Sequence, residues 1–131
     1  MRPWCVVCSI YYTMPENFGD FVRHRREMLR AGDPRFSVRQ VAARVGLEPS
    51  YLSKIERGEQ PPPSEESIRA LAGDLGIDPD LLLALAGKVG SDLQKIILKR
   101  PQLFAELLRD LRHLPDHAVL RLVREVRDGK W

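Results

Sequence analysis

The stretch that decides the fold, residues 37–59, reads SVRQVAARVGLEPSYLSKIERGE. Apolar residues recur at helical spacing in its first half, at Val41, Ala42 and Val45. Gly46 ends that helix, because glycine adopts the left-handed conformation of a helix terminus without steric cost. Pro49 suits the first turn of a following helix. The stretch therefore predicts two short helices joined by a tight turn.

The second of these helices, residues 49–57, carries a polar outer face. Leu52 and Ile55 point inward if each residue turns the helix by about 100°. The opposite side carries Ser50, Lys54 and Arg57. Such a face suits the major groove of DNA, where polar and cationic side chains meet base edges and phosphates. The alternative is an ordinary helical hairpin with a solvated charged face, which explains the apolar spacing but not the combination of Gly46 with Ser50, Lys54 and Arg57.

The residues QVA at 40–42, Gly46 and YLSKIERG at 51–58 resemble the helix-turn-helix family of phage repressors and Cro proteins. This family is also called the xenobiotic response element family, and the resemblance covers about residues 18–85. It implies an all-α, five-helix, lambda-repressor-like DNA-binding domain, which the remaining residues are expected to follow with a short C-terminal helical dimerisation region. It also implies a dimer that binds a two-fold symmetric operator.

The sequence departs from the family pattern where bases are read. The family commonly has a glutamine directly after the serine that caps the helix before the turn. It has a second glutamine at the start of the recognition helix. Here Val38 and Pro49 stand in those positions. The candidate DNA-binding residues are then Ser37, Arg39, Gln40, Ser50, Tyr51, Lys54 and Arg57. Lys54 against a guanine is the most specific of these contacts, whereas Tyr51 could equally be a packing residue.

The resemblance further implies a structural ion pair between Arg26 in the first helix and Glu56 near the end of the recognition helix. This pair would tie the two helices together, and an exposed Arg26 is the alternative. Between them, residues 30–36 (RAGDPRF) predict a loop that is longer than the connection usual in the family.

Positive charge gathers on the proposed DNA-reading segment. Nine cations stand against four anions in residues 21–57, whereas eleven cations meet eleven anions from residue 64 onward. The overall formal charge is only +3. A local positive field favours phosphate binding, and a solvated charged face is the alternative.

Composition excludes several classes of protein. A length of 131 residues allows one domain, or one small domain with an appendage. No window approaches the ~18 apolar residues that span a bilayer, so we expect a cytoplasmic protein without membrane contact. We also expect neither enzymatic activity nor a cofactor, because no nucleophile–base pair, glycine-rich phosphate loop or pocket-like pair of carboxylates is evident.

Residues 1–13 predict a poorly ordered extension, and Met14 resembles a natural start, so this extension could reflect a misplaced start codon. Cys5 and Cys8 have the CxxC spacing of a redox pair or half a zinc site, and WCxxC resembles the thioredoxin motif. Zinc requires four ligands and redox chemistry a βαβ context. We therefore interpret the two cysteines as incidental thiols.

Beyond a DNA-binding domain at residues 14–87, residues 88–131 predict three amphipathic helices, two of them opened by Pro101 and Pro115. About a dozen large apolar residues lie there, more than short helices can bury alone, which favours a partner. An identical tail, giving a homodimer through residues 91–127, is preferred. The alternative is a tail folded back on its own DNA-binding domain.

These patterns predict a homodimeric, sequence-specific DNA-binding transcriptional regulator that represses by occupying an operator. The rival interpretation is an antitoxin or adaptor whose C-terminal helices bind a toxin or metallopeptidase, with DNA binding for autoregulation. His113 and His117 are four residues apart, but the intervening Pro115 separates their helices, so no metal site is expected.

Overall fold

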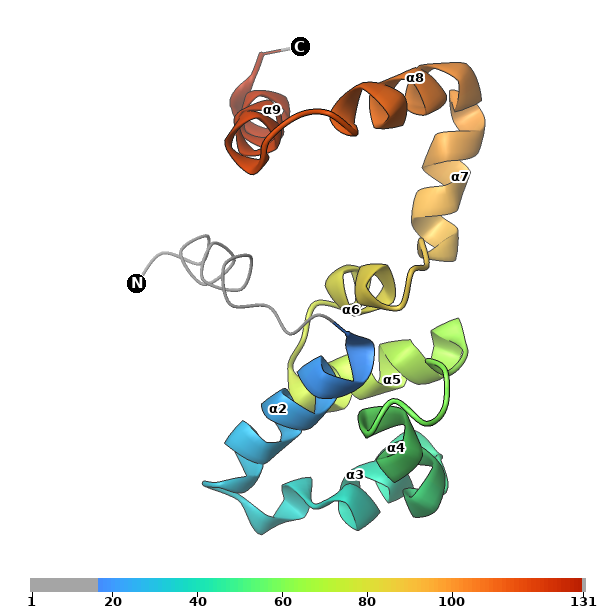
Figure 1. The fold of residues 1–131 in the computed structure, drawn as a ribbon, viewed down its shortest axis with the longest axis vertical. Helices are drawn as coiled ribbons and strands as arrows, with labels where there is room; N and C mark the ends of the chain where they lie inside the picture. The colour runs from blue at the N-terminus through green and yellow to red at the C-terminus, as the bar shows by residue number, and fades with distance from the viewer. Residues whose placement is uncertain (1–16, 131) are drawn as a thin grey trace. The chain divides into compact units, whose positions relative to one another are not determined.

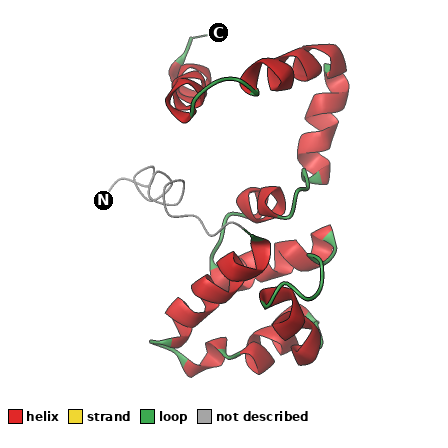
Figure 2. Cartoon of the chain, viewed as in Figure 1, coloured by secondary structure: helices red, strands yellow, loops and turns green. Residues whose placement is uncertain are grey.

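The computed structural model describes residues 17–130, and their regular structure is entirely helical (Figures 1 and 2). The elements in the N-terminal half are α2 (Phe18–Arg30), the 3-10 helix η1 (Pro34–Phe36), α3 (Val38–Val45), α4 (Pro49–Glu56), α5 (Glu65–Leu75) and α6 (Pro79–Leu85). Those that follow are α7 (Ser91–Lys99), α8 (Pro101–Leu111) and α9 (Asp116–Asp128). The expected all-α fold, with a five-helix domain before further helices, is confirmed. The predicted extension at residues 1–13, with Cys5 and Cys8, lies outside the described residues.

Polar side chains cap every α-helix of the N-terminal half except α4. The side chain of Asn17 accepts a hydrogen bond from the Asp20 amide at 2.8 Å, and Asp78 accepts one from Asp80 at 3.0 Å. Each cap satisfies an amide that has no partner inside its helix. Because these bonds join residues two or three positions apart, local sequence sets where α2 and α6 begin.

The core of the first five α-helices is apolar and closely packed. Its buried residues are Phe18, Val22, Val41, Ala42, Leu52, Ile55, Ile68, Leu71, Ala72, Leu75, Leu82 and Leu83. Every α-helix from α2 to α6 contributes at least two of them. Full burial of a large apolar side chain contributes about 1.5–3 kcal/mol, so this core fixes how α4 lies against α3.

Two local features differ from the sequence-based expectation. The segment 30–36, expected as a plain loop, contains η1. The side chain of Asp33 accepts a hydrogen bond from the Arg35 amide at 2.9 Å, and Pro34 has the dihedral angle that a helical turn requires. Pro115, which was expected to open the last helix, is the extended N-cap residue directly before α9, so the helix begins one residue later, at Asp116.

Contacts divide the chain after Gly90. In the second unit, α7 contacts α8, yet no residue of 91–130 is buried. Large apolar side chains are therefore left on the surface, and Leu98, Leu103 and Val126 are 73%, 63% and 70% exposed. In the part of the chain that the structure describes, no helix combines the length and apolar character needed to cross a membrane.

Candidate nucleic-acid interface

The site is built on the tight turn between α3 and α4. Gly46 ends α3 with a φ of 76°, the left-handed conformation that glycine adopts freely. The amide of Leu47 then donates to the Ala42 carbonyl at 2.9 Å and closes the helix terminus. Pro49 begins α4 at once, and Leu52 and Ile55 anchor this helix in the core. The orientation of α4 is thus set by its inner face, which leaves its outer face open.

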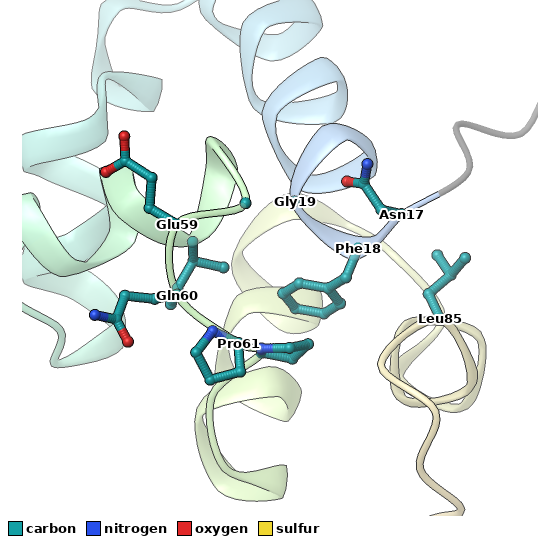
Figure 3. A pocket seen from close by; sticks show the side chains of 10 residues that line it. Asn17, Phe18, Gly19, Glu59, Gln60, Pro61 and Leu85 are labelled. Atoms are coloured by element: carbon teal, nitrogen blue, oxygen red, sulfur yellow. The ribbon is translucent and has the colours of Figure 1, made fainter.

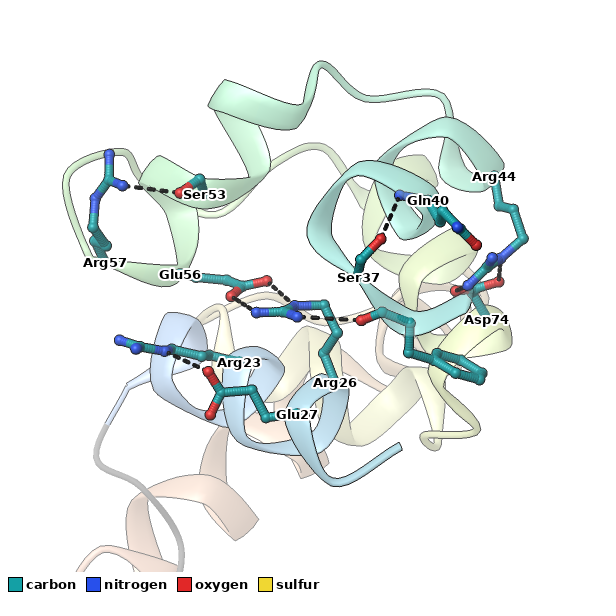
Figure 4. A network of polar contacts seen from close by, with 11 residues as sticks. Arg23, Arg26, Glu27, Ser37, Gln40, Arg44, Ser53, Glu56, Arg57 and Asp74 are labelled. Atoms are coloured by element: carbon teal, nitrogen blue, oxygen red, sulfur yellow. Dashed lines mark hydrogen bonds and ion pairs between the residues drawn. The ribbon is translucent and has the colours of Figure 1, made fainter. Parts of the chain in front are cut away.

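Polar side chains occupy that outer face. Ser50, Lys54 and Arg57 are all exposed. Arg57 donates to Ser53 Oγ at 2.9 Å (Figure 4) and to Glu59 Oε2 at 3.0 Å. The hydrogen bond from Arg57 holds the pKa of the Glu59 carboxyl below its usual value. Arg57 is therefore pre-positioned beside α4, and an incoming phosphate would compete with Glu59 for it.

The remaining candidate residues lie on α3, at its cap and at the start of α4. Ser37 Oγ accepts a hydrogen bond from the Gln40 amide at 3.3 Å, so this half-buried serine acts as a helix cap (Figure 4). Arg39 and Gln40 are exposed. Tyr51 is half-buried and packs against the core, so only part of its ring faces solvent.

Ion pairs reduce the number of cations that remain available on the positively charged surface expected from the sequence. Of the nine cations in residues 21–57, five pair with carboxylates: Arg23, Arg26, Arg35, Arg44 and Arg57. Arg25 instead donates to the Leu75 carbonyl at 2.9 Å. Within residues 17–130, no carboxylate lies within ion-pair distance of Arg30, Arg39 or Lys54, and all three are exposed. Lys54 is therefore the cation of α4 whose charge is left for an external anion.

A buried ion pair holds the C-terminal turn of α4 against α2. Arg26 donates from Nε and Nη2 to the two carboxylate oxygens of Glu56, each at 2.8 Å, and from Nη1 to the Phe36 carbonyl at 3.2 Å (Figure 4). Both side chains are 4% exposed. The hydrogen bond to Glu56 raises the pKa of Arg26 above its ordinary value, so the guanidinium stays charged although it is buried.

A close contact between α2 and the backbone of α4 reinforces the Arg26–Glu56 pair. This contact was not predicted from the sequence. Gly19 of α2 is buried against the end of α4. A Cβ atom at this position would collide with the Ile55 carbonyl oxygen and lie 2.9 Å from that of Glu56. Nothing near Gly19 in the sequence marks it as a packing glycine, because its neighbours come from a segment more than thirty residues away.

Another contact that the sequence did not reveal ties α3 to α5. Arg44 donates to both carboxylate oxygens of Asp74 at 2.6 and 3.0 Å (Figure 4) and lies over the Phe36 ring, 5.1 Å from its centroid. The hydrogen bond to Asp74 raises the pKa of Arg44. Arg44 therefore supports the scaffold, although its charge alone would have suggested a phosphate contact.

A hollow of about 570 Å³ opens between the start of α2 and the connector after α4 (Figure 3). Glu59 is the one ionisable side chain among its lining residues, and none of the candidate DNA-binding residues lines it. Across residues 17–130, no group of three or more metal-ligating side chains gathers. The hollow thus offers no chemistry comparable to that of the α4 surface.

A short helix with a polar outer face, set across a tight turn from a supporting helix inside a helical domain, defines the helix-turn-helix class. The family model described as "Helix-turn-helix domain" matches residues 17–85, which is more than half of the chain. The chain therefore belongs to the helix-turn-helix domain family. No curated protein and no solved structure matches it significantly. Membership in this family suggests DNA binding.

Proposed function

We propose that this chain is a cytoplasmic, homodimeric, sequence-specific DNA-binding repressor of the Cro and phage-repressor kind, which binds a two-fold symmetric operator through α4. One observation carries the proposal. Within a helix-turn-helix domain, Lys54 extends from the exposed outer face of α4, and none of the ion pairs among the described residues involves it. Such a side chain can bind an anionic partner that displaces water and offers hydrogen-bond acceptors. The major groove of DNA is a partner of this kind.

The candidate residues divide the work of recognition by position. Lys54 donates to guanine acceptors, and Ser50, one turn earlier on the same face, contacts a neighbouring base edge. Tyr51, half-buried, presents its hydroxyl end to the groove while its ring stays packed. Arg39 and Gln40 on α3, Ser37 at its cap, and Arg57 after α4 contact phosphates, which sets the register of α4 on the duplex.

The C-terminal helices supply the dimer. Their exposed apolar side chains include Ile96, Leu98, Leu103, Leu107, Leu108, Leu122, Val123 and Val126. A second copy of residues 91–127 would cover them, and a stable interface of this kind buries about 1,200–2,000 Å² in total. Two-fold pairing would hold two α4 helices about 34 Å apart, one turn of DNA. Repression then follows from occupying a promoter.

Selection from randomised duplexes tests the DNA-binding part of this proposal. We expect the full chain to recover a palindromic sequence with a fixed distance between its half-sites. Light scattering should give the mass of a dimer at micromolar concentration. Recovery of a single unpaired half-site by a monomeric protein would contradict the homodimer, and failure to retain any duplex at low salt would contradict DNA binding itself.

The second candidate function is an antitoxin or adaptor whose tail masks a toxin or metallopeptidase, with DNA binding for autoregulation. It is favoured by the same apolar exposure in α8 and α9, where Leu103 and Val126 lie mostly in solvent. Limited proteolysis separates the two functions. A dimer with a protected tail supports the repressor, whereas a monomer whose tail is cleaved first supports the adaptor.

A further inference from the structure

The chain turns back on itself where α4 ends. Gly58 has a φ of 76°, the left-handed conformation that glycine adopts without steric cost. Its amide donates to the Ile55 carbonyl at 3.1 Å, and the amide of Glu59 donates to the Lys54 carbonyl at 2.9 Å. This pair of hydrogen bonds is a common way for an α-helix to end. The backbone of Glu59 is therefore held against the last turn of α4.

The side chain of Glu59 belongs to a row of polar contacts beside α4. Arg57 Nη2 donates to Glu59 Oε2 at 3.0 Å. Arg57 Nη1 donates to Ser53 Oγ at 2.9 Å (Figure 4). Two contacts thus hold the guanidinium when no partner is bound. The Arg57 and Glu59 side chains are 49% and 55% exposed, so a partner can reach both of them from solvent.

The carboxylate of Glu59 also interacts with the second cation of the outer face. The hydrogen bond from Arg57 lowers the pKa of the Glu59 carboxyl, and the positive charges of Arg57 and Lys54 lower it further. Both cations are among the proposed DNA contacts, Lys54 to a base and Arg57 to a phosphate. Glu59 is therefore a negative charge beside the cations offered to DNA. A phosphate that binds the Arg57 guanidinium has to displace this carboxylate, because both anions bind the same N–H groups.

We propose that Glu59 is a restraining residue of the DNA interface: its carboxylate holds the Arg57 guanidinium in the free chain, and a DNA phosphate has to take Arg57 from it. The inference rests on the proposed DNA binding through α4. Because the exchange costs the free energy of the Arg57–Glu59 pair wherever the chain binds, Glu59 lowers the affinity for the selected site and for random duplexes alike. An exposed ion pair changes an equilibrium constant by up to about fivefold.

NMR relaxation of the Arg57 Nε–H group in the free chain tests the restraint without DNA. Glu59→Gln removes the negative charge and keeps the size of the side chain. Glu27→Gln is the matched control, because Glu27 forms a similarly exposed ion pair with Arg23 on α2. We expect the order parameter of Arg57 to fall in Glu59→Gln and to stay at the wild-type value in Glu27→Gln. Equal order parameters in wild type and Glu59→Gln would overturn the inference whatever the protein binds.

Titrations against the selected duplex and a random duplex test the consequence for binding. We expect Glu59→Gln to bind both duplexes about three- to fivefold more tightly than the wild-type chain does. Its affinity should also fall more steeply with salt, because no displaced carboxylate then takes up a cation. Glu27→Gln changes the net charge equally and should gain less than about twofold. Unchanged affinity in Glu59→Gln, or an equal gain in both variants, would overturn the restraining role.

A double-mutant cycle tests whether Glu59 acts through Arg57. In the Arg57→Gln background, Glu59→Gln should raise the affinity no more than Glu27→Gln does. An undiminished gain in that background would mean that the carboxylate repels phosphates directly, and would overturn the restraint of Arg57. If the wild-type chain retains neither duplex at low salt, the proposed function fails, whereas the NMR comparison still decides whether Glu59 holds Arg57.

Discussion

Lys54 and Glu56 lie two residues apart on α4 and have opposite environments. A separation of about 200° around the helix places Lys54 in solvent, whereas Glu56 is buried and paired with Arg26. The solvent-exposed charge of Lys54 can bind a new partner at little cost in free energy, whereas the buried charge of Glu56 cannot. Substitutions at these two positions should therefore separate recognition from stability.

Lys54→Ala should relax sequence preference and leave the fold intact. Loss of a lysine contact to a base costs about 1–3 kcal/mol on the specific site and much less on random duplexes. Binding titrations against the selected site and a scrambled duplex measure the difference, with Lys95→Ala as the control. Equal losses on both duplexes would show that Lys54 contacts only phosphate.

Glu56→Gln should lower the free energy of unfolding by about 3 kcal/mol, because it leaves the Arg26 guanidinium buried without a counter-charge. Urea denaturation measures the change. Glu59→Gln is the matched control: its pair with Arg57 is exposed to solvent, so little change is expected there. Similar urea midpoints of unfolding for both variants would mean that the buried ion pair contributes no more to stability than the exposed one.

At the scale of elements, α2 is the support on which the end of α4 lies. The Arg26–Glu56 pair and the backbone contact at Gly19 both act on the C-terminal turn of α4. The start of α4, which would lead into the groove, is held instead by the turn at Gly46 and by Leu52. Packing on α2 should therefore control the tilt of α4.

Gly19→Ala should destabilise the domain by about 1–3 kcal/mol, the usual cost of overpacking, because the new methyl group meets backbone carbonyls that cannot move without moving α4. Gly73→Ala in α5 is the opposite control. No atom lies within 4 Å of its added Cβ, so a gain of about 0.5–1 kcal/mol from helix propensity is expected. Thermal unfolding of both variants checks the pair, and a neutral Gly19→Ala would contradict the close approach.

At the scale of the whole molecule, the chain joins a unit with a buried core to one without. Within residues 17–130, the twelve residues of the apolar core all precede Gly90, whereas no residue of 91–130 is buried. Burial of apolar surface is the main term that offsets chain entropy. The C-terminal helices therefore need a second surface to become stable, and the proposed dimer provides it.

Truncation after Gly90 should leave a folded monomer that binds a single half-site as the full chain does. Its affinity for the two-fold site should fall by at least about a hundredfold, because the second half-site is then no longer bound intramolecularly. Circular dichroism, light scattering and binding titrations test these three statements. Full affinity for the palindromic site would show that the tail is not the dimer interface.

Much of the fold was predictable because its causes are local. Caps such as Asn17 and Ser37, the stop at Gly46 and the starts at Pro49 and Pro101 act within a few residues, so sequence alone indicated where these helices begin and end. Periodicity likewise predicted that Ser50, Lys54 and Arg57 point away from the core. The expected loop at 30–36 was wrong in part, because the cap at Asp33 organises it into η1.

The sequence by itself determined the helix-turn-helix and the polar outer face of α4, because helical periodicity and capping depend on neighbours along the chain. Only the tertiary structure decided which cations remain for an external anion. Arg44 carries the same charge as Lys54, yet Asp74, 30 positions away, neutralises it. The close approach of Gly19 to α4 is likewise a contact between distant segments, and the distance between such segments is set only when the whole core has packed.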